Sequence, residues 1–121
     1  MTCVLIAEDE PHIVESLSFV LRREGYDVTA VGDGETALAS VRRARPDVLI
    51  LDVMLPKLNG FEVLKQIRRD AALNSLPVIV LTAKGQSQDR RLAEEIGVSR
   101  FMTKPFSNRE VVEEVRRLTR R

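Results

Sequence analysis

Val48–Leu51 reads VLIL, the most apolar run of the chain, and Asp52 follows it directly. This run predicts the central strand of a sheet. Four other short runs also predict strands, and the full set is Cys3–Ala7, Asp27–Val31, Val48–Leu51, Val78–Leu81 and Phe101–Met102. Longer segments with helical spacing separate them. This strict alternation predicts an α/β fold: a parallel sheet with right-handed crossovers and helices on both faces.

The longer segments repeat apolar residues at helical spacing, as Ile13 and Leu17 do in the first of them. The predicted helices are Glu10–Glu24, Gly34–Ala44, Phe61 to about Arg69, Ser87–Ile96 and a last helix that follows Ser107. Ser107 and Glu110 fit a capping box at the start of that last helix. Turn formers in Met54–Gly60 predict a loop.

Length and charge limit the class of protein. The 121 residues suit one domain, which we expect to span residues 1–121. The 19 basic and 18 acidic residues give a net charge of +1, which creates no overall field for nucleic acid or an anionic membrane. No apolar stretch approaches the roughly 18 residues that a membrane-spanning helix needs. We therefore expect no direct contact with nucleic acid or membrane.

The single cysteine, Cys3, lies inside the first apolar run. With no second cysteine in the sequence, an intramolecular disulfide is excluded. A buried small side chain is the favoured interpretation over a reactive thiol. This cysteine usage fits a reducing compartment, and we expect the protein in the cytoplasm.

Functional side chains follow four of the predicted strands: Glu8 and Asp9, then Asp52, Thr82 and Lys104. The carboxyl ends of parallel strands meet along one rim of a sheet, so these residues are expected to share one pocket. Three carboxylates at one place repel each other unless a cation intervenes. Hard oxygen ligands of this kind select Mg²⁺, with Mn²⁺ as an alternative.

Beside such a metal site, Asp52 is the candidate nucleophile, because an aspartyl carboxylate can form an acyl phosphate. Lys104 would hold a phosphate oxygen as a point charge, and the Thr82 hydroxyl could donate to another. Plainer interpretations exist. Asp52 could be a turn former, Lys104 an ordinary surface lysine, and Glu10 a complement to the helix dipole.

Four ordered motifs carry a resemblance to a known family. They are VLIAEDE at residues 4–10, LDVMLPKLNG at 51–60, VLTAKG at 80–85 and FMTKPF at 101–106. Together they resemble the receiver domain of two-component response regulators, and the resemblance covers essentially the whole chain. It implies a flavodoxin-like, doubly wound five-stranded parallel sheet in the order 2-1-3-4-5 with five helices.

The resemblance also implies a mechanism. A sensor histidine kinase or a histidine phosphotransfer protein would phosphorylate Asp52. Asp9 and Asp52 would bind Mg²⁺ directly, Glu8 largely through water, and the backbone carbonyl of Met54 would complete the metal shell. Thr82 would then follow the phosphoryl group and the aromatic ring of Phe101 would swing inward.

The predicted readout is a remodelled face, formed by the fourth helix, the fifth strand and the fifth helix, that binds a downstream effector. Such a chain is a phosphoacceptor signalling domain rather than an enzyme, with at most self-phosphorylation from small donors and slow autodephosphorylation. Ser99–Arg100 stands where related DNA-binding regulators carry an acidic pair, so we expect a monomer or a weak phosphorylation-dependent dimer. In the resembling proteins, the positions of Met54 and Lys84 control access of water to the acyl phosphate. A cis peptide is expected at Lys104-Pro105.

Two rival functions share parts of this pattern. A Mg²⁺-dependent aspartyl phosphohydrolase would need a second acid two residues after Asp52, and Met54 occupies that position. A flavin-binding module of the same fold would need phosphate-cradling donors after the first strand. The acids Glu8, Asp9 and Glu10 stand there instead and would repel a phosphate.

Overall fold

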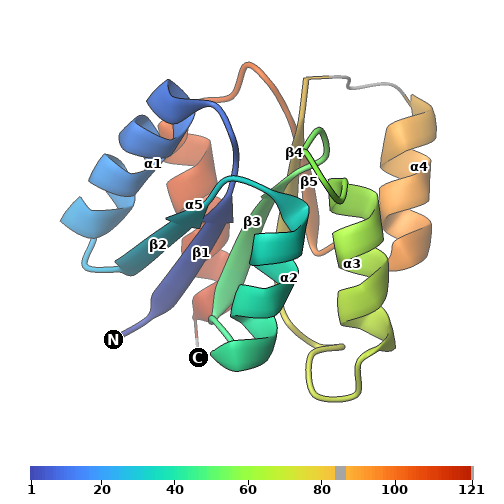
Figure 1. Cartoon of the computed structure of the whole chain (residues 1–121). Helices are drawn as coiled ribbons and strands as arrows, with labels where there is room; N and C mark the ends of the chain where they lie inside the picture. The colour runs from blue at the N-terminus through green and yellow to red at the C-terminus, as the bar shows by residue number, and fades with distance from the viewer. Residues whose placement is uncertain (84–86, 121) are drawn as a thin grey trace.

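A computed structural model describes residues 1–83 and 87–120, and in these ranges strands and helices alternate as predicted (Figure 1). The strands are β1 Cys3–Ala7, β2 Asp27–Val31, β3 Val48–Asp52, β4 Val78–Thr82 and β5 Arg100–Thr103. The helices are α1 Pro11–Arg23, α2 Gly34–Arg43, α3 Gly60–Arg69, α4 Ser87–Ile96 and α5 Asn108–Thr119.

The sheet has the strand order β2-β1-β3-β4-β5, and every pair is parallel. Helices α1 and α5 pack on one face, and α2, α3 and α4 lie on the other (Figure 1). All residues of β3 and β4 are buried, as expected for strands that are covered on both sides. The prediction of a flavodoxin-like doubly wound fold is confirmed.

Local hydrogen bonds fix where the helices begin. The Ser107 hydroxyl accepts from the Glu110 N–H at 3.0 Å, which confirms the predicted cap of α5. The Asn59 side chain accepts from the Glu62 N–H at 3.1 Å at the start of α3. At Gly60 a Cβ atom would lie 2.4 Å from the Asp52 carbonyl oxygen, so a larger residue would clash there. The β3–α3 loop thus returns to the end of β3.

Two predictions made from the sequence need correction. Cys3 is exposed rather than buried, since it is the first residue of β1 and lies beyond the cover of the helices. Several element ends also differ by a residue or two; β3 and β4, for instance, include Asp52 and Thr82. Among the residues described, none of the helices combines the length and the apolar composition needed to cross a membrane.

Candidate functional site

The predicted acidic cluster forms at the carboxyl ends of β1 and β3. Ligand oxygens of Glu8, Asp9 and Asp52 all lie within 4.8 Å of one another. Glu8 and Asp52 are each 2% exposed, whereas Asp9 is open to solvent. Because β1 and β3 are direct neighbours in the sheet, residues more than forty positions apart reach the same rim.

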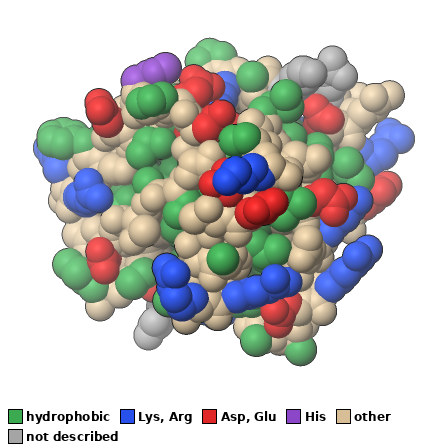
Figure 2. All heavy atoms as spheres, in the orientation of Figure 1, with side chains coloured by type: hydrophobic (Ala, Val, Ile, Leu, Met, Phe, Trp, Pro, Cys, Tyr) green, Lys and Arg blue, Asp and Glu red, His purple; other side chains and the backbone are tan. Residues whose placement is uncertain are grey.

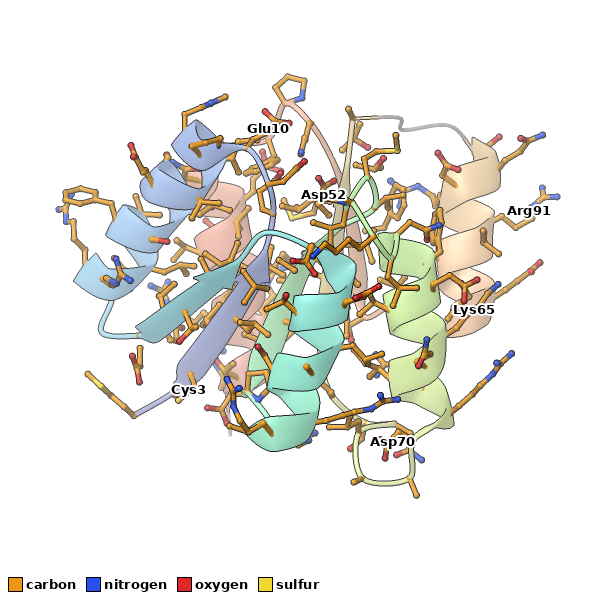
Figure 3. All side chains as sticks on the ribbon, in the orientation of Figure 1. Cys3, Glu10, Asp52, Lys65, Asp70 and Arg91 are labelled. Atoms are coloured by element: carbon orange, nitrogen blue, oxygen red, sulfur yellow. The ribbon has the colours of Figure 1, made fainter. Side chains whose placement is uncertain are left out.

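The site lies at one end of the molecule. Figure 3 shows Asp52 and Glu10 at the upper end of the sheet, with Cys3 at the opposite end. In the space-filling view, acidic side chains gather along the upper edge near the single histidine (Figure 2). These acids lie at the same end of the molecule as Asp52 and Glu10 (Figure 2, Figure 3).

Lys104 completes the cluster. Its ammonium Nζ lies 2.9 Å from Glu8 Oε1, 3.2 Å from Glu10 Oε1 and 3.5 Å from Asp52 Oδ2. The side chain is only 12% exposed, which excludes an ordinary surface lysine. The peptide Lys104-Pro105 is cis, as expected, and the Lys104 N–H donates to the Thr82 carbonyl at 2.7 Å. The end of β5 thus aims this lysine at the end of β3.

The charges in the cluster perturb one another. Burial raises the pKa of the Glu8 carboxyl, and the negative charge of Asp52 adds to this rise against the opposing effect of Lys104. Burial alone would lower the pKa of Lys104. The carboxylates of Glu8, Asp52 and Glu10 outweigh that effect, so the Lys104 pKa is raised. The lysine therefore stays positively charged next to an excess of negative groups.

The donor set fits a hard divalent cation. Glu8 Oε2 accepts from the Asp9 and Glu10 N–H groups, each at 3.1 Å, which fixes the carboxylate. Its other oxygen, Oε1, is buried and touches Lys104 without a hydrogen bond of favourable angle. Asp52 Oδ1 accepts from the Met54 N–H at 3.3 Å. Fixed carboxylate oxygens with unused lone pairs, open to solvent at Asp9, are what Mg²⁺ coordination requires.

The roles predicted for Thr82, Phe101, Lys84 and the Met54 carbonyl stay predictions. Thr82 is the fully buried last residue of β4, and Asp52 pairs with its neighbour Leu81. Phe101 on β5 is partly buried against the core, and the Arg90 guanidinium lies 4.7 Å from its ring centre. Lys84 is outside the described residues. The carbonyl role of Met54 is also still a prediction.

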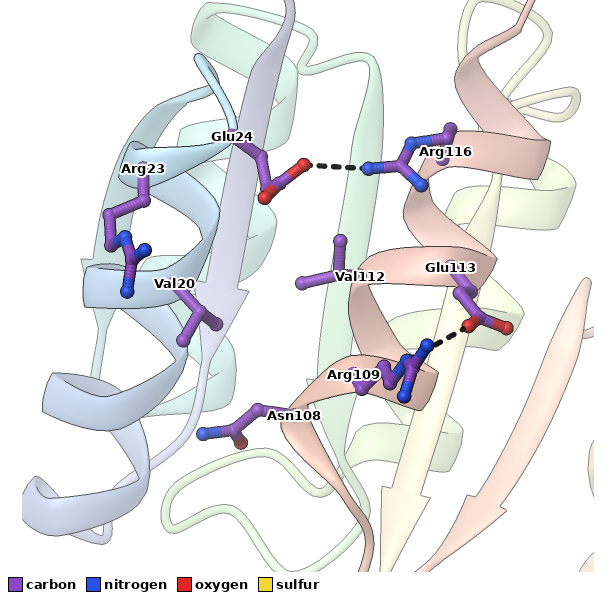
Figure 4. A pocket seen from close by; sticks show the side chains of 8 residues that line it. All are labelled: Val20, Arg23, Glu24, Asn108, Arg109, Val112, Glu113 and Arg116. Atoms are coloured by element: carbon purple, nitrogen blue, oxygen red, sulfur yellow. Dashed lines mark hydrogen bonds and ion pairs between the residues drawn. The ribbon is translucent and has the colours of Figure 1, made fainter.

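Several hollows border α1, and two of them also reach α5. One of about 470 Å³ adjoins the acidic cluster and is lined by residues that include Glu10, Lys104 and Phe106. The other, of about 590 Å³, lies between α1 and α5 over the floor residues Val20 and Val112 (Figure 4). The second hollow is a groove between helices rather than part of the acidic site.

The family comparison agrees with this geometry. The model of the response regulator receiver domain matches residues 4–116. This chain belongs to the receiver domain family of two-component response regulators. Family membership favours neither of the rival functions, the aspartyl phosphohydrolase and the flavin-binding module. Receiver domains are signalling domains whose partners are histidine kinases.

Relatives and solved structures support the assignment to receiver domains. The chain is 44% identical over 121 residues to the sensory transduction protein RegX3 of Mycolicibacterium smegmatis, covering all of this chain and 52% of that protein. It is 46% identical over 118 residues to the alkaline phosphatase synthesis transcriptional regulatory protein PhoP of Bacillus subtilis, covering 98% of this chain and 48% of that protein. The chain therefore spans about half the length of the curated relatives it matches.

Among solved structures, the receiver domain of sensor histidine kinase PA1611 from Pseudomonas aeruginosa superposes with a TM-score of 0.89 at 32% identity, covering 98% of this chain and 97% of that chain. That structure has a magnesium ion coordinated in its active-site cleft. The Francisella response regulator 1452 receiver domain gives a TM-score of 0.91 at 30% identity, with 98% and 97% covered.

Sequence reasoning missed one member of this receiver site. Glu10 was assigned to the helix dipole, yet its carboxylate also contacts Lys104, a residue 94 positions away. The EDE string at residues 8–10 offered a weak signal, because a third acid there extends the acidic cluster. Only the fold shows that Glu10 contacts the Lys104 ammonium.

Proposed function

We propose that this chain, as a single receiver domain over residues 1–121, accepts a phosphoryl group on Asp52. The donor is a sensor histidine kinase or a histidine phosphotransfer protein. The observation that carries the proposal is the buried Asp52 carboxylate, held between two further carboxylates and the Lys104 ammonium at 3.5 Å. A nucleophile, a cation site and a fixed positive charge thus converge on one point.

The transfer is a displacement at phosphorus. An Asp52 carboxylate oxygen attacks, a new P–O bond forms, and the P–N bond to the donor histidine breaks with its electron pair returning to the imidazole nitrogen. Lys104 then binds a phosphoryl oxygen and the Thr82 hydroxyl donates to another.

The metal site of the proposal is formed by Glu8, Asp9, Asp52 and the Met54 carbonyl. The cation is Mg²⁺, with Mn²⁺ as an alternative, and when bound it neutralises the phosphoryl oxygens during transfer. The protein is a phosphoacceptor rather than an enzyme. It is capable at most of self-phosphorylation from small donors and slow autodephosphorylation.

The proposed output of phosphorylation is a change in the shape of one binding surface of the domain. The phosphoryl group brings about 1.5 to 2 negative charges and three acceptor oxygens in place of the single charge of the Asp52 carboxylate, Thr82 follows it, and Phe101 moves inward. This remodels the face made of α4, β5 and α5, which binds a downstream effector domain or protein. The chain works in the cytoplasm as a monomer or a weak phosphorylation-dependent dimer, without direct contact with nucleic acid or membrane.

The test is incubation with acetyl phosphate and Mg²⁺, followed by intact-mass measurement. Wild type should gain one phosphoryl group, which hydroxylamine removes, and Asp52→Asn should gain none. Asp70→Asn is the matched control, because Asp70 lies at the opposite end of the molecule from Asp52 (Figure 3). Chelation of the metal should also abolish the adduct. An adduct of the same yield on Asp52→Asn would exclude this phosphoacceptor.

A further inference from the structure

Glu10 has a carboxylate whose position the helix does not explain. It is the N-cap residue of α1, yet its side chain makes no capping hydrogen bond. Instead, Glu10 Oε1 accepts a hydrogen bond from Lys104 Nζ at 3.2 Å. Its other oxygen, Oε2, lies 3.6 Å from the exposed imidazole of His12. The Glu10 side chain therefore turns away from the helix start and toward the site lysine.

The three carboxylates around Lys104 differ in how firmly they are held. Glu8 is buried and fixed by two backbone N–H groups. Asp52 is buried and is the group to be phosphorylated. Glu10 is 47% exposed, and no backbone donor is found on its side chain among the described residues. Moving Glu10 into water costs less than moving either buried carboxylate, since a half-exposed ion pair is weak.

A phosphoryl group on Asp52 changes what Lys104 must bind. The ammonium has three N–H donors, and three carboxylates already surround it. Phosphorylation converts the Asp52 carboxylate into an acyl phosphate whose phosphoryl oxygen needs a Lys104 N–H donor, and Glu10 Oε1 already accepts one of these donors at 3.2 Å. Of the three carboxylates, Glu10 can move into water at the smallest cost in free energy. Its negative charge would also repel the incoming phosphoryl group.

We propose that Glu10 is a positioning residue: it holds Lys104 in the unphosphorylated domain and competes with the phosphoryl group for this lysine. This inference rests on the proposed function of Asp52. By holding Lys104, Glu10 lowers the stability of the phosphorylated state relative to the unphosphorylated state. The residue at this position would then set how tightly the domain retains a phosphoryl group.

The expected consequence is a gain of affinity when the charge is removed. Glu10→Gln keeps the size of the side chain but weakens its hold on Lys104. Beryllofluoride, which occupies the phosphoryl position on the aspartate, should bind about two- to fivefold more tightly, the range expected for a partly exposed ion pair. A helix-dipole role alone would change thermal stability and leave beryllofluoride affinity as it is.

The experiment titrates beryllofluoride in saturating Mg²⁺ and follows binding by NMR. Glu15→Gln is the matched control, because it removes an exposed acid from the same helix. Tighter binding by Glu10→Gln alone supports the proposal. Equal tightening by both variants would mean that overall charge is responsible, and unchanged or weaker binding by Glu10→Gln would overturn the proposal as well.

A mutant cycle supplies the readout that a structural role would not change. In a Lys104→Gln background, Glu10→Gln should not increase the affinity for beryllofluoride, because Glu10 then has no ammonium to hold. A gain of the same size in that background would contradict the inference. If the Lys104 variant binds too weakly to titrate, the comparison of Glu10→Gln with Glu15→Gln decides. Failure of wild type to bind beryllofluoride would instead exclude the proposed function itself.

Discussion

The α1–α5 side of the molecule and the α4 helix are held to the sheet very differently. α5 buries Val111, Val112 and Val115, and Arg116 pairs at 2.6 Å across the groove with Glu24, the residue that follows α1 (Figure 4). All ten residues of α4 are described, and among them only Ala93 is buried. Next to α4, none of the four residues of β5 is fully buried.

This contrast shows where the domain can rearrange at a low cost in free energy. Local stability follows buried apolar contact, so α4 and β5 should open at a lower free energy than α1 or α5. The acidic site itself is formed by strands β1 and β3, which are buried over most of their length. A rigid site next to a weakly packed edge is the arrangement needed for a local charge change to move one surface without unfolding the domain.

The largest test of the contrast uses one chemical change at two helices. Leu17 of α1 is fully buried, whereas Leu92 of α4 is 36% exposed. Leu17→Ala should reduce the free energy of unfolding by about 2–5 kcal/mol because it leaves a cavity in the core. Leu92→Ala should cost less than about 1 kcal/mol. Urea denaturation measures both, and similar losses would remove the contrast.

A second prediction concerns the anchor that α4 does have. Arg68 of α3 donates to the Gly97 carbonyl just beyond α4 at 2.8 Å and to the Leu76 carbonyl before β4 at 2.7 Å. Arg68→Ala should destabilise the domain by about 1–3 kcal/mol, because two hydrogen bonds from a charged donor to loop carbonyls are lost. Amide exchange should accelerate in α4 more than in α5. Exposed Arg69→Ala is the control; uniform acceleration in both helices would argue against a local anchor.

Most of the fold could be read from the sequence, because its signals are local. Apolar runs such as VLIL at residues 48–51 and helical spacing fixed the order of elements, and the order alone implied a parallel sheet. The juxtaposition of Glu8, Asp9 and Asp52 followed from that topology and is confirmed. Lys104 also reached the place that its strand end predicted.

Contacts between distant side chains could not be read in this way. The bonds of Arg68 to the loops after α3 and α4, the stacking of Arg90 on Phe101, and the contact of Glu10 with Lys104 depend on rotamers and on helix positions. The burial of Cys3 was predicted wrongly for a similar reason, since a strand pattern does not show where the covering helices end. Sequence patterns identify faces, whereas packing decides partners.

A smaller effect is expected at the start of α5. The Ser107 hydroxyl accepts from the Glu110 N–H at 3.0 Å. Ser107→Ala should cost about 1 kcal/mol of stability, and Ser107→Asp should retain it, because aspartate also caps helices. Thermal unfolding compares the two. Because α5 is anchored by its valines, the loss should appear as reduced global stability rather than local fraying of α5, and fraying confined to α5 would weaken the contrast.

The smallest effect concerns the ring proposed to move. The Arg90 guanidinium lies 4.7 Å from the centre of the Phe101 ring, whereas its neighbour Arg91 points away from the body of the protein (Figure 3). Arg90→Ala should cost about 0.5–1 kcal/mol, the usual strength of an exposed cation–π contact, and Arg91→Ala should cost nothing measurable. Such a loss applies only to the resting position of the ring, so it would shift the population toward the moved state by about two- to fivefold. NMR of the Phe101 ring without phosphoryl donor measures that shift. Equal spectra for the two variants would mean that Phe101 is held by core packing alone, and the weakly packed edge would then need another trigger.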